Sequence, residues 1–294
     1  MNLKLGIIGG SGIYDLSEIK NKRMILATNG PFGTPSSNIV TGELYGVEIF
    51  FLPRHGNNHI YNPTNVPYRA NIDILKRLGC NDILSISAVG SLKEGLAPGK
   101  FVIINQFIDK TFSRKKTFFD NKIVAHVSMA EPTCRLTSEL VYKAAIDAKI
   151  DIQFKGTYLA MEGPQFSSLA ESQLYRNMSC DVIGMTNMPE AKLARESEIR
   201  YVPVVMVTDY DCWRDNENNV EVNDIINTLN KNADKAKLLI KSFVKEFKVN
   251  RPKEIIDGID NVLDTAIITK NYTNENLIEN GLDAVASRII NASK

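Results

Sequence analysis

Short apolar segments rich in β-branched residues alternate along this chain with longer segments whose apolar residues recur at helical spacing. The strand-like pattern is strongest over residues 201–208 (YVPVVMVT), and the clearest helical pattern covers residues 223–247. Such alternation is typical of α/β proteins, in which helices pack on a parallel or mixed sheet. We therefore expect a single-domain α/β fold with a central mixed β-sheet flanked by helices.

The other elements are predicted from the same two periodicities. We expect the segment after Pro252 to form two amphipathic helical stretches, since its apolar residues keep helical spacing, although a disordered tail is an alternative. Residues 1–250 then form the main domain, and residues 251–294 a helical extension packed on the core or on a neighbouring subunit. Further strands are predicted over residues 3–8, 46–52, 82–87, 99–104, 154–161 and 182–185, and further helices over 68–78, 137–148 (N-cap Thr137 or Ser138), 168–177, 189–197, 253–269 and 274–290.

The composition limits what the chain can bind. There are 35 Lys and Arg residues against 34 Asp and Glu, a net charge of +1, so no overall field favours nucleic acid or an acidic membrane. The N-terminal apolar stretch is too short for a signal peptide, and no apolar run could span a membrane. The four cysteines are scattered without a close pair. We expect a cytoplasmic protein with reduced thiols that binds small molecules through local features.

Polar or glycine-rich residues follow several predicted strands, which is where α/β proteins bind ligands. The run from Gly9 to Gly12 allows close approach of an anion, but a dinucleotide fingerprint would need a glycine where Asp15 stands. A plain tight turn explains this run equally well. Arg54 and His55 follow the next strand and can clamp a phosphate, although a solvated Arg beside a satisfied His is the alternative. No neighbouring carboxylate or thiol completes a metal site there.

Three more strand ends contribute small, hydroxyl or aromatic groups. Ser87 begins a run of small residues that opens a strand end to a ligand, and Thr186 adds a second hydroxyl. Phe166 could stack on a flat heterocycle, although core packing is the simpler explanation for a single Phe. Together these segments predict a composite pocket.

Two aspartates leave the end of the most apolar strand. Asp209 and Asp211 are two residues apart and therefore leave it on the same side. In a shared pocket they would repel each other, and one pKa would rise. A protonated and an ionised Asp together match the N7 acceptor and the exocyclic amine of adenine. Taken alone, however, the pattern more often marks a turn with two solvated aspartates, or a pair of metal ligands.

Taken in order, these segments resemble the purine nucleoside phosphorylase family, in the branch that acts on 5′-methylthioadenosine. Matching stretches include GIIGGSGIYD, RHGNNH, KGTYLAMEGPQFSS, MTNMPEAKLARE and VTDYDCW, and the likeness extends from residue 6 to about residue 247. The resemblance implies phosphorolysis, in which phosphate attacks C1′ of the ribosyl group and the purine leaves. Inorganic phosphate is then a co-substrate, and no metal or organic cofactor is expected.

The resemblance also assigns roles to individual residues. Asp209 would protonate N7 of the leaving purine, which requires its pKa to rise by about three units, or the proton to transfer as the bond breaks. His126 would reach the methylthio end of the pocket from a neighbouring subunit, which implies a homotrimer or a hexamer. The implied phosphate-binding residues are Ser11, Arg54, His55, Ser87 and Thr186. The implied substrate-binding residues are Ala88, Gly90, Phe166, Ser167, Met185, Asp209, Asp211, Val222, Ile225 and Ile226.

Two other functions remain open from the sequence. A phosphorylase for 6-oxopurine nucleosides or methylthioinosine would have to recognise O6, an acceptor, for which Asn suits position 209 better than Asp. An NAD-dependent module is supported only by the glycine-rich start, and the missing third glycine argues against it. The sequence therefore favours a nucleoside of adenine.

Overall fold

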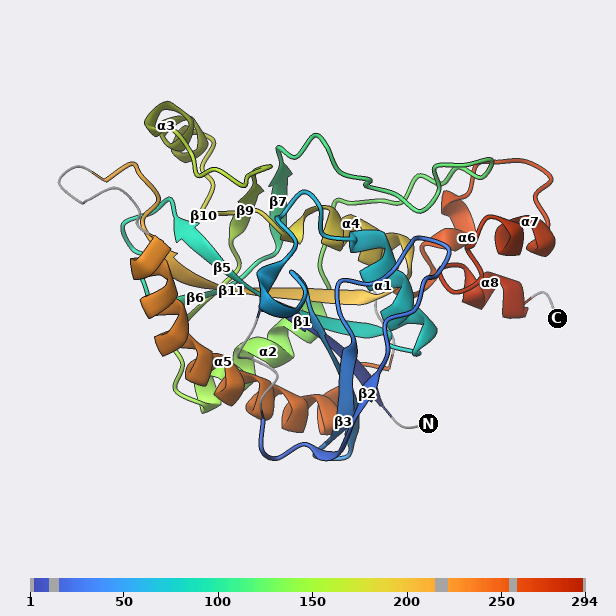
Figure 1. Cartoon of the computed structure of the whole chain (residues 1–294), viewed down its shortest axis with the longest axis horizontal. Coiled ribbons are helices and arrows are strands. Elements are labelled where there is room, and N and C mark those ends of the chain that lie inside the picture. The colour runs from blue at the N-terminus through green and yellow to red at the C-terminus, as the bar shows by residue number, and fades with distance from the viewer. Residues whose placement is uncertain (1–2, 11–15, 215–221, 254–257, 293–294) are drawn as a thin grey trace.

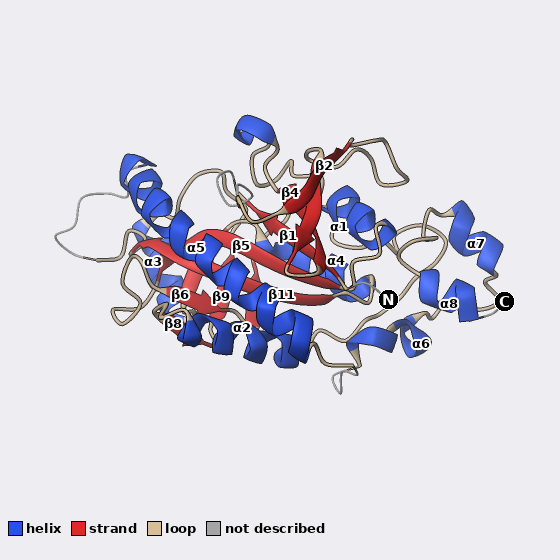
Figure 2. Cartoon of the chain, turned by 90° about the horizontal axis from the view of Figure 1, so that it is seen from below, coloured by secondary structure: helices blue, strands red, loops and turns tan. Residues whose placement is uncertain are grey.

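The computed structural model of the chain describes residues 3–10, 16–214, 222–253 and 258–292, with the backbone alone at residues 222–227 and 229. These residues form an eleven-stranded mixed sheet with helices on both faces (Figures 1 and 2), which confirms the predicted α/β class. The strands are β1 (Lys4–Gly9), β2 (Lys20–Ile25), β3 (Ile39–Leu44), β4 (Val47–Pro53), β5 (Asp82–Ser91), β6 (Phe101–Ile103), β7 (Gln106–Asp109), β8 (Ile152–Phe154), β9 (Thr157–Ala160), β10 (Val182–Gly184) and β11 (Arg200–Asp209). The helices are α1 (Tyr68–Arg77), α2 (Arg135–Asp147), α3 (Leu169–Asn177), α4 (Asn187–Glu196), α5 (Val222–Asn250), α6 (Leu263–Ala266), α7 (Asn274–Glu279) and α8 (Ser287–Ala292), with short 3₁₀ turns at Asn57–His59 and Ile259–Asn261.

The strands β5 and β11 form the centre of the sheet. β11 runs parallel to β5 along almost its whole length, from Arg200 beside Asp82 to Asp209 beside Gly90. β1 pairs in parallel with the first half of β5, whereas β10 pairs antiparallel with its last residues. Both faces of β11 are buried, which explains its unbroken apolar sequence.

Helices cover each face of the sheet with a separate apolar core. On one face, Val141 of α2 and Phe243 of α5 pack with side chains of the central strands. On the other face, Ile72 of α1 and Leu193 of α4 belong to a second core. Figure 2 shows α5 running along its side of the sheet. Among the described residues, none of the helices combines the length and the hydrophobicity of a membrane span.

The segment after Pro252 packs on the side of the molecule that carries α1 and α4. Leu277 and Val285 are fully buried in the same core as those two helices. Arg288 binds the Glu198 carboxylate with N–O distances of 2.7 and 2.8 Å. Instead of the two long helices predicted, this segment contains α6, α7, α8 and a 3₁₀ turn. Positive φ angles at Gly258, Asn271 and Gly281 interrupt the helical pattern.

Three local predictions were wrong for identifiable reasons. β5 does not stop at residue 87, because its last residues continue to pair with β11 and β10. The strand predicted over residues 154–161 begins at the last residue of β8 and is interrupted before β9, since the backbone turns at Lys155 (φ 75°) and Gly156, where a Cβ would lie 2.7 Å from the side chain of Val102. The N-cap of α2 is Cys134, so Thr137 and Ser138 lie inside the helix.

Three strands, β2, β3 and β7, were not predicted at all. β2 (KNKRMI) is almost entirely exposed and lacks any apolar periodicity. It pairs with β3, which in turn pairs with β4, so these strands extend one edge of the sheet. β7 is half-buried and lies beside β9. Pairing with a neighbouring strand, rather than a pattern of its own, defines β2 and β7.

A buried carboxylate fastens the loop that follows β7 to α4. Glu196 accepts hydrogen bonds from the hydroxyl of Thr117 (2.6 Å) and the backbone N–H of Phe118 (2.7 Å). Burial raises the pKa of Glu196 to about 7, and these two hydrogen bonds only partly oppose the shift. The folded chain therefore takes up a proton at this site between about pH 4.5 and pH 7, where the unfolded chain has lost it.

This proton uptake makes the free energy of unfolding fall as pH rises through that interval. We expect Glu196→Gln to remove the slope, so that the melting temperature of the variant, relative to the parent, rises between about pH 5 and about pH 8. Thermal unfolding at several pH values measures the difference. A difference that stays constant with pH would contradict a raised pKa at Glu196.

Candidate active site

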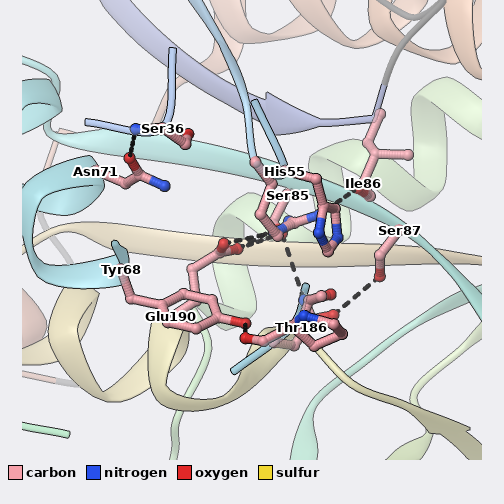
Figure 3. A network of polar contacts seen from close by, with 12 residues as sticks. Ser36, His55, Tyr68, Asn71, Ser85, Ile86, Ser87, Thr186 and Glu190 are labelled. Carbon is pink, nitrogen blue, oxygen red and sulfur yellow. Dashed lines mark hydrogen bonds and ion pairs between the residues drawn. The ribbon is translucent and has the colours of Figure 1, made fainter. Parts of the chain in front are cut away.

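The antiparallel pairing of β10 with β5 brings two predicted strand ends together. Val182 lies beside Ser91 and Ile183 beside Gly90, so the chain after β10 runs back along β5 towards Ser87. Ser87 donates a hydrogen bond to Asn187, the first residue of α4, at 2.9 Å. Figure 3 shows Ser87 and Thr186 close together, with Ser85, Glu190 and His55 around them. The structure thus gathers two predicted hydroxyl groups over the middle of β5.

The predicted aspartate pair lies beside the end of β5. A Cβ added to Gly90 would lie 2.9 Å from Oδ1 of Asp209 and 3.4 Å from Cβ of Asp211, so only glycine leaves room for them. Asp209 accepts hydrogen bonds from Thr208 Oγ1 (2.7 Å) and from the backbone N–H of Asp211 (2.8 Å). Ser172 of α3 donates to the carboxylate of Asp211. The three segments β5, α3 and β11 therefore enclose the two carboxylates.

The environment of both carboxylates favours their protonated form. Burial raises the pKa of Asp209, although its hydrogen bonds from Thr208 and Asp211 work against the shift. Burial also raises the pKa of Asp211, and repulsion from Asp209 adds to the effect at that residue. The direction is the one predicted from the Asp-x-Asp pattern. The pair can therefore supply a donor and an acceptor to one flat ligand.

Arg54 is buried in an ion pair with Glu190 of α4, and only 1% of its surface is exposed. Its Nε and Nη2 atoms lie 2.7 and 3.0 Å from the two carboxylate oxygens. Nη2 also donates to Ser85, and Nη1 to the carbonyl of Ile86. Burial alone would lower the pKa of Arg54, but Glu190 outweighs it and raises the pKa above its ordinary value. One guanidinium N–H remains without a partner among the described residues, which limits the direct clamp predicted for Arg54.

Glu190 sets the direction of a chain of hydrogen bonds that ends at Ser87. A carboxylate only accepts, so Tyr201 (2.7 Å) and Ser85 (2.6 Å) must donate to it. The amide nitrogen of Asn187 then donates to Tyr201 at 2.8 Å, which turns the amide oxygen of Asn187 towards Ser87. Ser87 is consequently the donor in its contact with Asn187.

His55 is a half-buried, neutral histidine. Its Nδ1 lies 2.9 Å from the carbonyl of Tyr61, and its ring stacks on that of His59 with centroids 4.1 Å apart. Burial lowers the pKa of His55 to about 4, and the positive charge of Arg54 acts in the same direction. Because the carbonyl can only accept, Nδ1 carries the hydrogen, and Nε2 of the neutral ring is an acceptor.

The other predicted site residues are distributed as follows. Met185 contacts the loop after β9, because a Cβ on Gly163 would lie 2.5 Å from its sulfur. Phe166 in that loop is 48% exposed. His126 is also exposed, and its backbone N–H donates to the carbonyl of Ala266 in the C-terminal segment.

Two further predicted residues are half-buried: Ala88 lies on β5, and Ser167 lies before α3. Ser11 lies outside the described residues, and Val222, Ile225 and Ile226 begin α5, where only the backbone is described.

Several residues of this site were missed by the sequence reasoning. Glu190, Asn187, Tyr201 and Ser85 form the buried polar network, but each resembles an ordinary helix or strand residue in the sequence. One signal was available: Ser85 and Ser87 interrupt an apolar strand two residues apart, which places both hydroxyls on one face.

Comparison with known proteins gives consistent results. The family model of the Phosphorylase superfamily matches residues 4–245. S-methyl-5′-thioadenosine phosphorylase of Rhodospirillum rubrum is 51% identical over 286 residues, which cover 97% of each chain, and that of Cereibacter sphaeroides is 49% identical over 99% of each. A crystal structure of methylthioadenosine phosphorylase from an antarctic soil metagenomic library has a TM-score of 0.89 and 45% identity, covering 97% of this chain and 99% of that one. Methylthioadenosine phosphorylase from Schistosoma mansoni in complex with adenine has a TM-score of 0.84 and 34% identity, over 90% of this chain and 99% of that one.

The Arg54–Glu190 ion pair predicts a large loss of stability when one partner is removed. Glu190→Gln leaves the guanidinium charge buried and uncompensated, so the free energy of unfolding should fall by about 3–5 kcal/mol. The control is Glu246→Gln, which breaks an exposed ion pair with Lys143 and should cost less than about 1 kcal/mol. Urea unfolding measures both, and equal losses would contradict the buried ion pair.

A second prediction concerns the protonation of His55. In phosphate-free buffer, its ring C–H resonances should show no titration between about pH 5 and about pH 8, because its pKa is held near 4. The resonances are assigned by their absence in His55→Gln. A midpoint between about pH 6 and about pH 7 would show that the ring is solvated instead.

Proposed function

The chain belongs to the Phosphorylase superfamily, and on that premise we propose that it cleaves 5′-methylthioadenosine with inorganic phosphate. The products are adenine and 5-methylthioribose 1-phosphate. The observation that carries the proposal is the pair Asp209 and Asp211, enclosed beside Gly90 on the same strand that carries Ser87. An adenine-binding end and an anion-binding end therefore lie along the same stretch of β5.

Phosphate is bound at the end of the site that holds Ser87, Thr186 and His55. The two hydroxyls donate to phosphate oxygens, and Nε2 of neutral His55 accepts a hydrogen bond from the P–OH group of hydrogenphosphate, which orients the anion. Arg54 contributes positive charge and at most one direct hydrogen bond, since Glu190, Ser85 and Ile86 occupy the other N–H groups of its guanidinium. Ser11 follows β1 and is proposed as a further hydroxyl ligand.

The chemical step is a displacement at C1′ of the sugar. A phosphate oxygen bonds to C1′ while the C1′–N9 bond breaks, and the bonding electrons leave with the purine. Asp209 transfers its proton to N7, so that the purine departs as neutral adenine. Asp211, held by Ser172, accepts from the exocyclic amine. Burial raises the pKa of Asp209 and so favours the protonated form that this transfer requires.

The rest of the substrate is bound by groups around the two ends. Phe166 stacks on the base, with Ser167 as its polar neighbour, and Met185 contacts the ribose. Ala88 and Gly90 line the base and sugar along β5. Val222, Ile225 and Ile226 surround the methylthio group. We also propose a homotrimer or hexamer in which His126 of a neighbouring copy completes that end, which agrees with the exposure of His126 in the single chain.

A substrate panel tests the proposed function. The purified chain should release adenine from methylthioadenosine only when phosphate is present, because phosphate is the nucleophile. Methylthioinosine and inosine should react slowly, since O6 would face a carboxylate acceptor where adenine offers an amine. Cleavage of either one faster by about two orders of magnitude would overturn the assignment of the base.

Substitution of Asp209 tests the proton donor. Asp209→Asn keeps the shape but cannot transfer the proton, so kcat for methylthioadenosine should fall by about 100-fold or more. Asp283→Asn, at an ion pair with Arg77 near the C-terminal segment, is the matched control and should retain kcat. Unchanged turnover in Asp209→Asn would rule out its role as the acid.

A further inference from the structure

Arg114 joins loops that carry most of the proposed site, although it belongs to none of the groups assigned so far. Its guanidinium is almost completely buried. Nη1 donates to the carbonyl of Met185 and, at 2.6 Å, to that of Met188. Met185 precedes Thr186 in the sequence, and Met188 follows it. Nη2 donates to the carbonyl of Glu162 in the loop after β9, at 2.7 Å.

Glu162 extends the same junction to one more loop and ties it back to the loop that carries Arg114. Its carboxylate accepts from Thr64 (2.5 Å), in the loop that follows His55, and from the backbone N–H groups of Phe112 (2.6 Å) and Ser113 (3.2 Å). It also pairs with Nε of Arg114 at 3.2 Å. Burial alone would raise the pKa of Glu162, but these hydrogen bonds and Arg114 together lower it to about 2. The carboxylate is therefore ionised at every pH at which the chain would be assayed.

The geometry explains why arginine and glutamate stand at these positions. A guanidinium is a planar fork that donates in several directions at once, so it can bind carbonyls of two different loops and a carboxylate. Lysine would offer a single point of charge. The two loops also touch directly, since Gly163 (φ 68°) lies against the sulfur of Met185. A displacement of Arg114 would thus shift both loops relative to each other.

We propose that Arg114 and Glu162 are a positioning pair that holds the phosphate-binding Thr186 in register with the loop bearing Phe166. Neither side chain touches the reacting atoms, so they act through the backbone of residues 161–163 and 185–188. The inference rests on the proposed function, because it assigns phosphate to one loop and the nucleoside to the other. Its consequence is that one substitution impairs the use of both substrates.

The test compares Arg114→Lys with Arg251→Lys. Both replacements keep the charge and remove the guanidinium fork from an ion pair with a buried carboxylate, but Arg251 binds Asp82 at the start of β5, away from the site. The readouts are kcat, the KM for each substrate and the melting temperature, with kinetics measured well below the melting temperature of every variant. Glu162→Gln is a second variant that keeps the shape of the carboxylate while removing its charge.

Arg114→Lys should lower kcat/KM by on the order of 100-fold, with the KM values for phosphate and methylthioadenosine both raised, because a small displacement of positioned groups costs about this much. Glu162→Gln should change the same parameters in the same direction. Arg251→Lys should lower the melting temperature alone. The proposal is overturned if Arg114→Lys stays within about twofold of the parent in all three kinetic parameters, or if Arg251→Lys loses as much activity.

Binding measurements separate this inference from the proposed function. If the parent chain does not turn over methylthioadenosine, the proposed function fails, and calorimetric titration with phosphate and with adenine then judges the positioning pair without turnover. Weaker binding of both ligands to Arg114→Lys than to Arg251→Lys supports the pair. Equal binding to the two variants overturns it.

Discussion

The buried ion pair between Arg54 and Glu190 is the interaction on which the site depends most. A charge within the sheet is tolerable only when a partner and further hydrogen bonds satisfy it, and here both partners are almost fully buried. The carboxylate of Glu190 in α4 accepts hydrogen bonds from Arg54 after β4, Ser85 in β5 and Tyr201 in β11. These hydrogen bonds hold the four elements together. The polar network is therefore also the device that aligns the elements carrying Ser87, Thr186 and His55.

The position of the site is a consequence of strand direction. β10 pairs antiparallel with the last residues of β5, so the chain that leaves β10 runs back towards the middle of β5. β11 runs parallel to β5 and delivers Asp209 to the tip, next to Gly90. If β10 ran in the opposite direction, the chain after it would carry Thr186 past the tip of β5 and away from Ser87. The arrangement spaces the proposed anion-binding and base-binding groups along a single strand.

Much of the fold could be predicted because buried strands and amphipathic helices leave clear periodicities, as in residues 201–208 and 223–247. The predicted strand ends also contained the hydroxyls, the histidine and the aspartates that the structure brings together. What escaped prediction depends on contacts distant in sequence. β2 forms because it pairs with β3. Glu190 lies in a helix, and nothing near it in the sequence indicates that it pairs with Arg54, 136 residues away. For Arg114, likewise, nothing in the surrounding residues indicates that four loops meet at its ion pair with Glu162.

At the anion-binding end that we propose, the contact between Ser87 and Asn187 makes anion capture an exchange and not a simple addition. Ser87 has one hydroxyl hydrogen, and in the free chain Asn187 holds it. An arriving anion must offer a better acceptor than an amide oxygen before that hydrogen changes partners. Strongly basic oxyanions meet this condition, whereas weakly basic ones of similar size gain little. This one hydroxyl therefore ranks anions by their basicity, which is a form of selectivity that pocket shape alone cannot provide.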